Sequence, residues 1–194
     1  MRRIGIVLPA TADDARFQTF VGAFLQEMQS SGWSIGRNLR IDTRWATPNA
    51  VTIRRQVAEL VALTPDVILA FGASTVRPLL QATRTVPIVF AVASDPVGNG
   101  FVDSLGRPGG NVTGFMSFEY TMAGKWLELL KQIAPSVTRV AVLRDADTPS
   151  GNAMLSVIQA MAPSLRLEVT RGTCATPARS SAFLWPLRGR RVPV

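Results

Sequence analysis

The sequence contains no histidine and only one cysteine, Cys174, among its 194 residues. Without histidine, the chain cannot form the Ser-His or Cys-His pairs that activate many nucleophiles, and it lacks the commonest metal ligand. A single cysteine cannot form a disulfide within the chain, so cysteine usage does not indicate the redox compartment. The absence of histidine weighs against enzymes that depend on such a pair and against a histidine-based metal site.

The phosphate-binding motifs of nucleotide-dependent enzymes are also absent. No G-x-G-x-x-G follows the first predicted strand, where the turn reads LPATADDA, and no G-x-x-x-x-G-K-[ST] occurs. The segment from Gly72 to Val76 begins like a G-x-S-x-G elbow but lacks its closing glycine. We interpret the near-neighbour acidic pairs as solvated helix starts: Asp13 with Asp14, and Asp145 with Asp147. We therefore expect no catalytic residue, no metal and no cofactor.

No run of about 18 apolar residues occurs, so the sequence predicts no transmembrane helix and no direct membrane insertion. The amino terminus is basic, but the apolar run from Ile4 to Ala10 is too short for a signal peptide and leads directly into Thr11. Expressed as it stands, the chain is expected to remain in the cytoplasm.

Acidic residues are missing from the last part of the chain. The formal net charge is +8, and five of the arginines lie after Thr170, where no Asp or Glu occurs. Before that point, 16 basic residues stand against 13 acidic ones, which is an ordinary surface. A nucleic-acid-binding protein should carry its basic residues on a folded face, so we expect no nucleic-acid partner.

What the sequence does contain is a regular alternation of strand and helix patterns. Strands are predicted over residues 4–8, 39–45, 67–71, 86–92 and 111–115. Between them lie helix patterns over about 13–30, 49–63 and, after the loop from Gly72 to Thr75, up to about Thr83. Strands that alternate with helices predict an α/β fold, with a doubly wound parallel sheet built from right-handed crossovers.

Two of these segments have informative patterns. Residues 39–45 alternate apolar and polar side chains, which predicts an edge strand. The first helix carries an apolar stripe that we expect to pack as core against the sheet. The stripe consists of Phe17, Phe20, Val21, Phe24, Leu25 and Met28.

The stretch 86–115 is predicted to form a strand, a functional turn, a short helix, a glycine turn and a further strand. Its apolar, β-branched opening is typical of a buried parallel strand. Asp95 suits a helix N-cap with Pro96 at the first helical position, which predicts a short helix. That helix would hold Phe101, Val102 and Leu105, and the glycine-rich turn 106–110 would end it before the last strand.

Ligands of open α/β sheets lie outside the carboxyl ends of the strands, so the turns that follow strands are candidate sites. A glycine followed by small hydroxyl residues at a helix N-terminus suits a carboxylate, although Ser74 or Thr75 could instead cap its helix. Asp95 could pair with a ligand ammonium group, cap a helix, or do both. The candidate ligand-binding residues are Thr11, Gly72, Ala73, Ser74, Thr75, Ser94, Asp95 and Asp145. Trp45 and Phe71 could stack on a ligand, but core packing is favoured for both.

The pattern restarts after Ser117 and disappears after Thr170. A helix is predicted over 119–133, a strand over 137–143, a helix over 149–161 and a strand over 165–170. The predicted organisation is a first α/β lobe over residues 1–117, an incomplete second α/β lobe over 118–170, and an atypical basic tail over 171–194. The abrupt change of composition favours a non-native tail, such as a frameshifted end; the alternative is a disordered one.

Three segments resemble the substrate-binding proteins of ABC transporters grouped with tryptophan and tyrosine uptake systems. They read AFGASTVRPLLQATRTVPIVF, SDPVGNGFVDSLGRPGGNVTGF and AGKWLELLKQIAPSVTRVAVL, and the resemblance runs from about Ile4 to about Thr170. It implies a type I periplasmic binding protein whose two lobes close around a small-molecule ligand. It also implies an ABC permease as partner, a periplasmic location, an amino acid as the first ligand to test, and ligand contacts at the candidate turns, with Asp145 facing them from the second lobe.

Two other classes share such a sheet. The effector-binding half of a two-lobed transcription regulator would need a DNA-reading helix-turn-helix, and nothing precedes Ile4 that could supply one. A flavodoxin-like enzyme would need the phosphate loop that is absent. A solute-binding module is therefore the leading hypothesis.

Overall fold

The computed structural model describes residues 1–47, 49–144 and 149–173. The chain forms two compact units, Met1–Phe118 and Glu119–Val194. The candidate residue Asp145 lies outside the described residues, as does the predicted tail from residue 174 onward.

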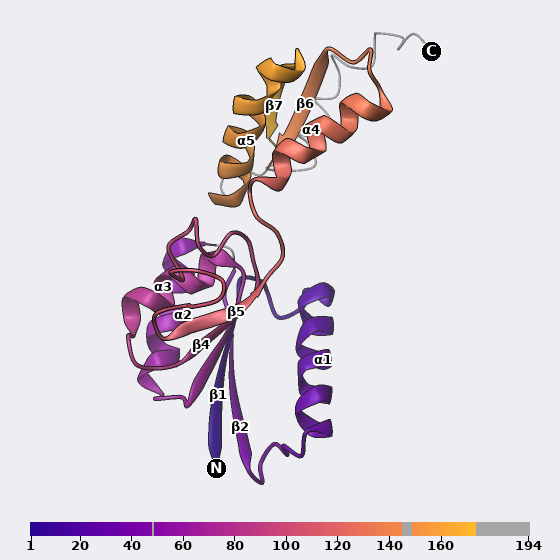
Figure 1. Ribbon diagram of the computed structural model, residues 1–194. Helices are drawn as coiled ribbons and strands as arrows, with labels where there is room; N and C mark the ends of the chain where they lie inside the picture. The colour runs from indigo at the N-terminus through magenta and orange to yellow at the C-terminus, as the bar shows by residue number, and fades with distance from the viewer. Residues whose placement is uncertain (48, 145–148, 174–194) are drawn as a thin grey trace. The chain divides into compact units, whose positions relative to one another are not determined.

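The first unit is built on five parallel strands in the order β2-β1-β3-β4-β5 (Figure 1). The strands are β1 (Arg2–Leu8), β2 (Leu39–Trp45), β3 (Val67–Phe71), β4 (Ile88–Ala93) and β5 (Val112–Met116). The helices are α1 (Ala15–Ser30), α2 (Ala50–Ala62) and α3 (Ala73–Ala82). The predicted parallel α/β sheet is confirmed, and β2 lies at its edge as its alternating pattern indicates.

Side-chain caps set the starts of the first two helices. The Asp14 carboxylate accepts hydrogen bonds from the backbone N–H groups of Arg16 and Phe17, at 3.0 and 3.2 Å, so α1 begins at Ala15 rather than at the predicted Asp13. The Asn49 side chain does the same for α2. Each cap satisfies N–H groups that have no carbonyl partner within the helix.

The two faces of the sheet are covered to different extents. Helices α2 and α3 lie on one face and α1 lies on the other (Figure 1). The face under α2 and α3 holds the larger core, which includes Val7, Ile53, Val57, Leu60, Ile68, Val76, Leu79, Ile88 and Phe90. This core fixes the strand ends from which the candidate turns project.

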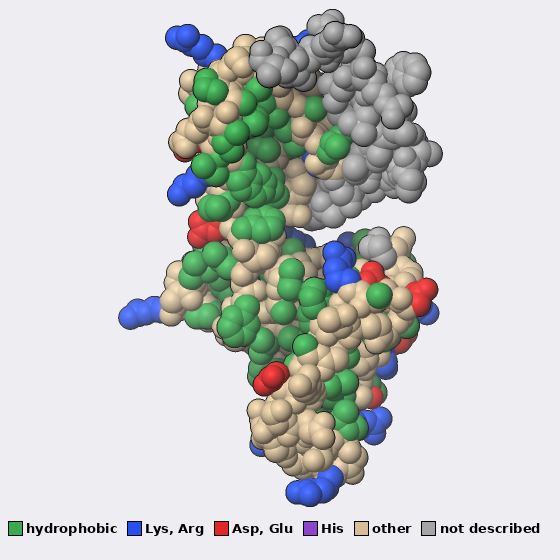
Figure 2. Space-filling view, turned by 90° about the vertical axis from the view of Figure 1, so that its right-hand side faces the viewer, with side chains coloured by type: hydrophobic (Ala, Val, Ile, Leu, Met, Phe, Trp, Pro, Cys, Tyr) green, Lys and Arg blue, Asp and Glu red, His purple; other side chains and the backbone are tan. Residues whose placement is uncertain are grey.

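The α1 face is only partly covered. Its buried residues are Ile4, Ile6, Leu8, Leu39 and Phe71, and most of the α1 stripe packs on them without becoming buried. Phe20 remains 37% exposed, so the expectation that the whole stripe is core holds only in part. On β5, Phe115 is 77% exposed, and Figure 2, which looks onto the α1 side, shows hydrophobic side chains at the surface there. One helix is too narrow to cover five strands.

The short helix predicted after Asp95 does not form. Residues 96–100 are a series of turns, in which Asn99 N–H donates to the Asp95 carbonyl at 3.0 Å and Phe101 N–H donates to the Pro96 carbonyl at 2.8 Å. Asp95 has φ 42°, whereas an N-cap residue needs extended backbone, and Gly100 has φ 67°. Phe101 and Val102 are buried as expected, but Leu105 is 56% exposed.

The second unit has the predicted order of helix, strand, helix and strand. Its elements are α4 (Met122–Ile133), β6 (Arg139–Arg144), α5 (Pro149–Met161), the 3-10 helix η1 (Ala162–Leu165) and β7 (Glu168–Thr173). Strands β6 and β7 are parallel, and the unit's buried apolar cluster includes Ala123, Leu127, Ile158, Ala162 and Leu167. The strand predicted over 165–170 therefore lies three residues too early at both ends, and residues 171–173, predicted to belong to the tail, are part of β7. Within the described part of the chain, no helix has the length and apolar character required to cross a bilayer.

Candidate functional site

The strand order creates a switch point between β1 and β3. The connection through α1 leaves β1 toward one face of the sheet, and the connection through α3 leaves β3 toward the other. A crevice is expected outside the carboxyl ends of the strands at such a point. A Cβ atom added to Gly72 would lie 3.9 Å from Cγ of Pro9, so the turns after β1 and β3 are close neighbours.

Gly72 forms the turn from β3 into α3. Its φ of 74° and ψ of 158° favour glycine strongly, because a Cβ atom disfavours this conformation. The helix begins directly afterwards at Ala73, so the predicted loop 72–75 is shorter than expected. Ala73 and Ser74 occupy the first turn, where backbone N–H groups lack intrahelical partners. Ser74 is exposed, so this turn offers both N–H groups and a hydroxyl.

Thr75 has a structural role. Its side chain is completely buried, and its hydroxyl lies 2.9 Å from the Phe71 carbonyl oxygen and 3.0 Å from that of Gly72. No side chain caps α3, so the alternative that Ser74 or Thr75 is its N-cap is wrong. Thr75 instead fastens the first turn of the helix to the end of β3, which positions Ala73 and Ser74.

Ser94 and Asp95 follow β4, the neighbour of β3. The Ser94 hydroxyl lies 3.4 Å from the hydroxyl of Ser117, which follows β5. The Asp95 carboxylate accepts a 2.9 Å hydrogen bond from Gly98 N–H through Oδ1, and Asp95 N–H donates to the Phe118 carbonyl at 3.0 Å. A Cβ atom at Gly98 would collide with this carboxylate. These contacts fix the position of Asp95 in the turn after β4.

Thr11 lies in the turn after β1 and is exposed. A hydrogen bond from its hydroxyl to Asp13, followed by one from the Asp13 backbone, lowers the pKa of the Asp13 carboxyl from its ordinary 3.8. Thr11 thus lies at the same edge as Gly72 and Ser94, but its hydroxyl serves its own turn.

Sequence reasoning missed one unusual residue at this edge. Val92 is an extra residue in β4: Ala91 pairs with Phe115 and Ala93 pairs with Met116, which leaves Val92 in a β-bulge. Its φ is 59°, a left-handed conformation that costs about 1–2 kcal/mol for residues with a Cβ atom. Nothing in the sequence signals this, because a valine within VPIVFAVA is typical of an ordinary buried strand.

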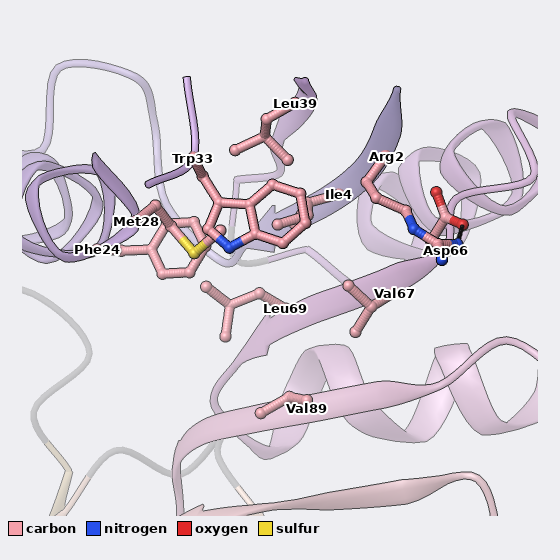
Figure 3. Close-up of a pocket in the computed structure, with 10 residues that line it drawn as sticks. All are labelled: Arg2, Ile4, Phe24, Met28, Trp33, Leu39, Asp66, Val67, Leu69 and Val89. Carbon is pink, nitrogen blue, oxygen red and sulfur yellow. Dashed lines mark hydrogen bonds and ion pairs between the residues drawn. The ribbon is translucent and has the colours of Figure 1, made fainter. Parts of the chain in front are cut away.

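An open, mostly apolar cavity lies at the opposite edge of the sheet, at the amino ends of the strands (Figure 3). Its volume is about 510 Å³, and it lies between α1 and the part of the sheet that α1 leaves open. The walls are mostly apolar, and the ion pair of Arg2 Nη1 with Asp66 Oδ1, 2.7 Å long, lies on one side (Figure 3). The main lining residues are Ile4, Phe24, Met28, Trp33, Leu69 and Val89. We attribute this cavity to incomplete coverage of the sheet, since it contains none of the polar turn residues.

Comparisons with known proteins agree with this architecture. A family described as ABC transporter substrate binding protein matches residues 4–176. A tyrosine-binding protein of Clostridioides difficile (strain R20291) is 26% identical over 167 residues, which cover 86% of this chain and 48% of that protein.

Two solved structures have the same fold. The conserved domain protein from Vibrio cholerae O1 biovar El Tor gives a TM-score of 0.77 at 24% identity, covering 93% of this chain and 60% of that one. The ABC domain from Streptococcus pneumonia in complex with L-Trp also gives 0.77, at 20% identity, covering 97% and 62%.

The chain belongs to the family of ABC transporter substrate-binding proteins, since the family match spans most of its length. The predicted type I periplasmic-binding-protein fold is likewise confirmed. The chain spans about half the length of the tyrosine-binding protein and about 60% of the two solved structures.

Proposed function

We propose that this chain is the solute-binding component of an ABC importer and binds an amino acid at the carboxyl edge of its five-stranded sheet. The observation that carries the proposal is the pairing of a helix N-terminus with a carboxylate on neighbouring strands. Ala73 and Ser74 begin α3 after β3, and Asp95 follows β4. Gly72 N–H donates to the Ala91 carbonyl at 3.0 Å, which fixes the Gly72 turn against β4, the strand that leads to Asp95.

The two groups complement the two charges of a zwitterion. The N–H groups and positive dipole end of α3 suit the ligand carboxylate. Asp95 suits the ammonium group, because one of its oxygens is held by Gly98 and a carboxylate can accept several hydrogen bonds. Tyrosine and L-Trp, the ligands named for two of the similar proteins, both carry this pair of charges.

The remaining parts of the proposal follow from the family. A substrate-binding protein holds its ligand without covalent chemistry and passes it to a permease, so no catalytic group or cofactor is required. The site is therefore expected to work by complementarity of charge and shape. Its place of action would be outside the cytoplasmic membrane, where the family normally acts.

Calorimetric titration with four ligands tests the proposal. We expect L-tyrosine or L-tryptophan to bind, and tyramine, which lacks the carboxylate, to bind at least tenfold more weakly. 3-(4-Hydroxyphenyl)propionate, which lacks the ammonium group, should also bind at least tenfold more weakly. Failure of both amino acids to bind would contradict the proposed ligand class.

Two variants test which protein group binds the ligand carboxylate and which binds its ammonium group. Ala73→Pro removes one N–H at the first helical position, where proline is tolerated. It should lower the affinity for L-tyrosine at least fivefold and leave the affinity for tyramine unchanged. Asp95→Asn should weaken L-tyrosine but not 3-(4-hydroxyphenyl)propionate. Ala50→Pro makes the matched change at the first position of α2 and should leave every affinity unchanged. Equal losses in Ala73→Pro and Ala50→Pro would place the carboxylate elsewhere.

A further inference from the structure

Val92 has a backbone conformation that its own packing does not explain. It is a β-branched residue at φ 59°, a true outlier for this side-chain type. Val92 is 52% exposed, whereas Phe90, two positions earlier in β4, is 2% exposed and the following Ala93 is fully buried. The strain is therefore not offset by burial of the valine itself.

Hydrogen bonds on both sides hold the residue in this conformation. On one side, Gly72 N–H donates to the Ala91 carbonyl at 3.0 Å; on the other, Ser117 N–H donates to the Ala93 carbonyl at 3.0 Å. The register shift between Ala91 and Ala93 places the extra residue between these two anchors. Because both neighbours are fixed, Val92 must leave the plane of the pleat. Bulges of this kind commonly re-aim a side chain next to a functional site.

The bulge stands between the groups assigned above to ligand binding. Val92 follows the part of β4 that is tied to the Gly72 turn, and it precedes Ser94 and Asp95 by two and three positions. These turns supply hydrogen-bonding and charged groups, so a ligand with an apolar body also needs an apolar contact here. Backbone strain that persists at such a place is a recognised indication of function.

We propose that Val92 is a specificity-determining residue whose strained, half-exposed side chain contacts the apolar body of the ligand. The inference rests on the proposed function, since it concerns the same edge of the sheet. The isopropyl group would bound the space for the ligand side chain, while the α3 N-terminus and Asp95 bind the charged end. The ligand class is an amino acid with a large apolar or aromatic side chain.

Three variants test the inference with L-tyrosine and L-tryptophan as probes. Val92→Asn introduces a residue that tolerates positive φ, so the melting temperature should rise by about 2–4 °C. The same change should weaken L-tyrosine at least fivefold. Val92→Ala keeps the backbone conformation but removes two methyl groups. It should weaken L-tyrosine binding, and L-tryptophan binding should be weakened less, because the removed methyl groups leave space for the larger side chain.

Thr64→Asn is the matched control. Thr64 is an exposed residue at φ 49°, before the amino end of β3 and hence at the opposite edge of the sheet. Its replacement should raise the melting temperature and leave both affinities unchanged. If Val92→Asn binds as the wild type does, or fails to raise the melting temperature, the inference is overturned. If the wild type binds neither probe, the proposed function itself fails and the inference falls with it.

Discussion

The buried hydroxyl of Thr75 donates to the carbonyl oxygen of Phe71 across 2.9 Å, and the two residues bracket the turn from β3 into α3. This contact fastens the first turn of α3 to the end of a buried strand. Thr75, a candidate ligand-binding residue in the sequence, therefore holds the first turn of α3 in position. Ala73 and Ser74, which it positions, remain the groups directed to a ligand carboxylate in our proposal.

Replacing Thr75 by Val tests this support. The change keeps the shape of the side chain and removes the hydroxyl, so we expect a loss of about 1 kcal/mol in the free energy of opening around β3. Native-state amide hydrogen exchange of β3 residues measures this free energy. Ser74→Ala, at an exposed position, should change it by less than about 0.5 kcal/mol. Equal effects of the two substitutions would contradict the structural role of Thr75.

A second prediction concerns the conformation of Gly72. Gly72→Ala should destabilise the protein by about 1–3 kcal/mol, because alanine is strained at φ 74° and ψ 158°. Gly22→Ala is the control, since Gly22 lies inside α1 with open space around it and should stabilise by about 0.5–1 kcal/mol. Urea unfolding of both variants measures the difference. A neutral Gly72→Ala would show that the turn does not need glycine.

Gly98 leaves room for the Asp95 carboxylate. Gly98→Ala would place a Cβ atom against that carboxylate and displace it, so we expect L-tyrosine to bind at least threefold more weakly. Gly106→Ala adds a methyl group where nothing lies within 4 Å and should leave binding unchanged. Calorimetric titration separates the two cases. Unchanged binding by Gly98→Ala would remove Asp95 from the proposed site.

Asp66 gives a prediction for pH. Hydrogen bonds from the Arg3 backbone and then from the Arg2 side chain lower the pKa of its carboxyl below the ordinary 3.8. Since the folded protein holds the ionised form, the associated stability is present above about pH 4 and is lost as the pH falls through the lowered pKa. Asp66→Asn should therefore flatten the decrease of stability below about pH 4, as measured by thermal melting. An unchanged slope would contradict this role.

Much of the fold could be predicted because it depends on periodicity. The strand 67–71 and the helix 149–161 were predicted with the bounds that the structure gives. Apolar runs and stripes report burial, which decides these elements. The alternation of strand and helix then leaves a parallel sheet as the simplest arrangement.

The failures lie where backbone conformation depends on tertiary contacts. Asp95-Pro96 has the composition of a helix start, but Asp95 at φ 42° and Gly98 against its carboxylate form a series of turns instead. The Val92 bulge is created by hydrogen bonds from two neighbouring strands' turns, and no local pattern encodes such a pairing. Thr75 was predicted to bind the ligand or to cap α3, whereas its side chain is buried and its hydroxyl bonds the end of β3, which the sequence pattern does not reveal.

Amide chemical-shift mapping during a titration with L-tyrosine locates the bound amino acid most directly. The largest shifts are expected at the carboxyl edge of the sheet, at Ala73, Ser74, Ser94 and Ser117. Shifts confined to the amino edge, around Arg2, Trp33 and Val67 in the apolar cavity, would contradict the proposed site.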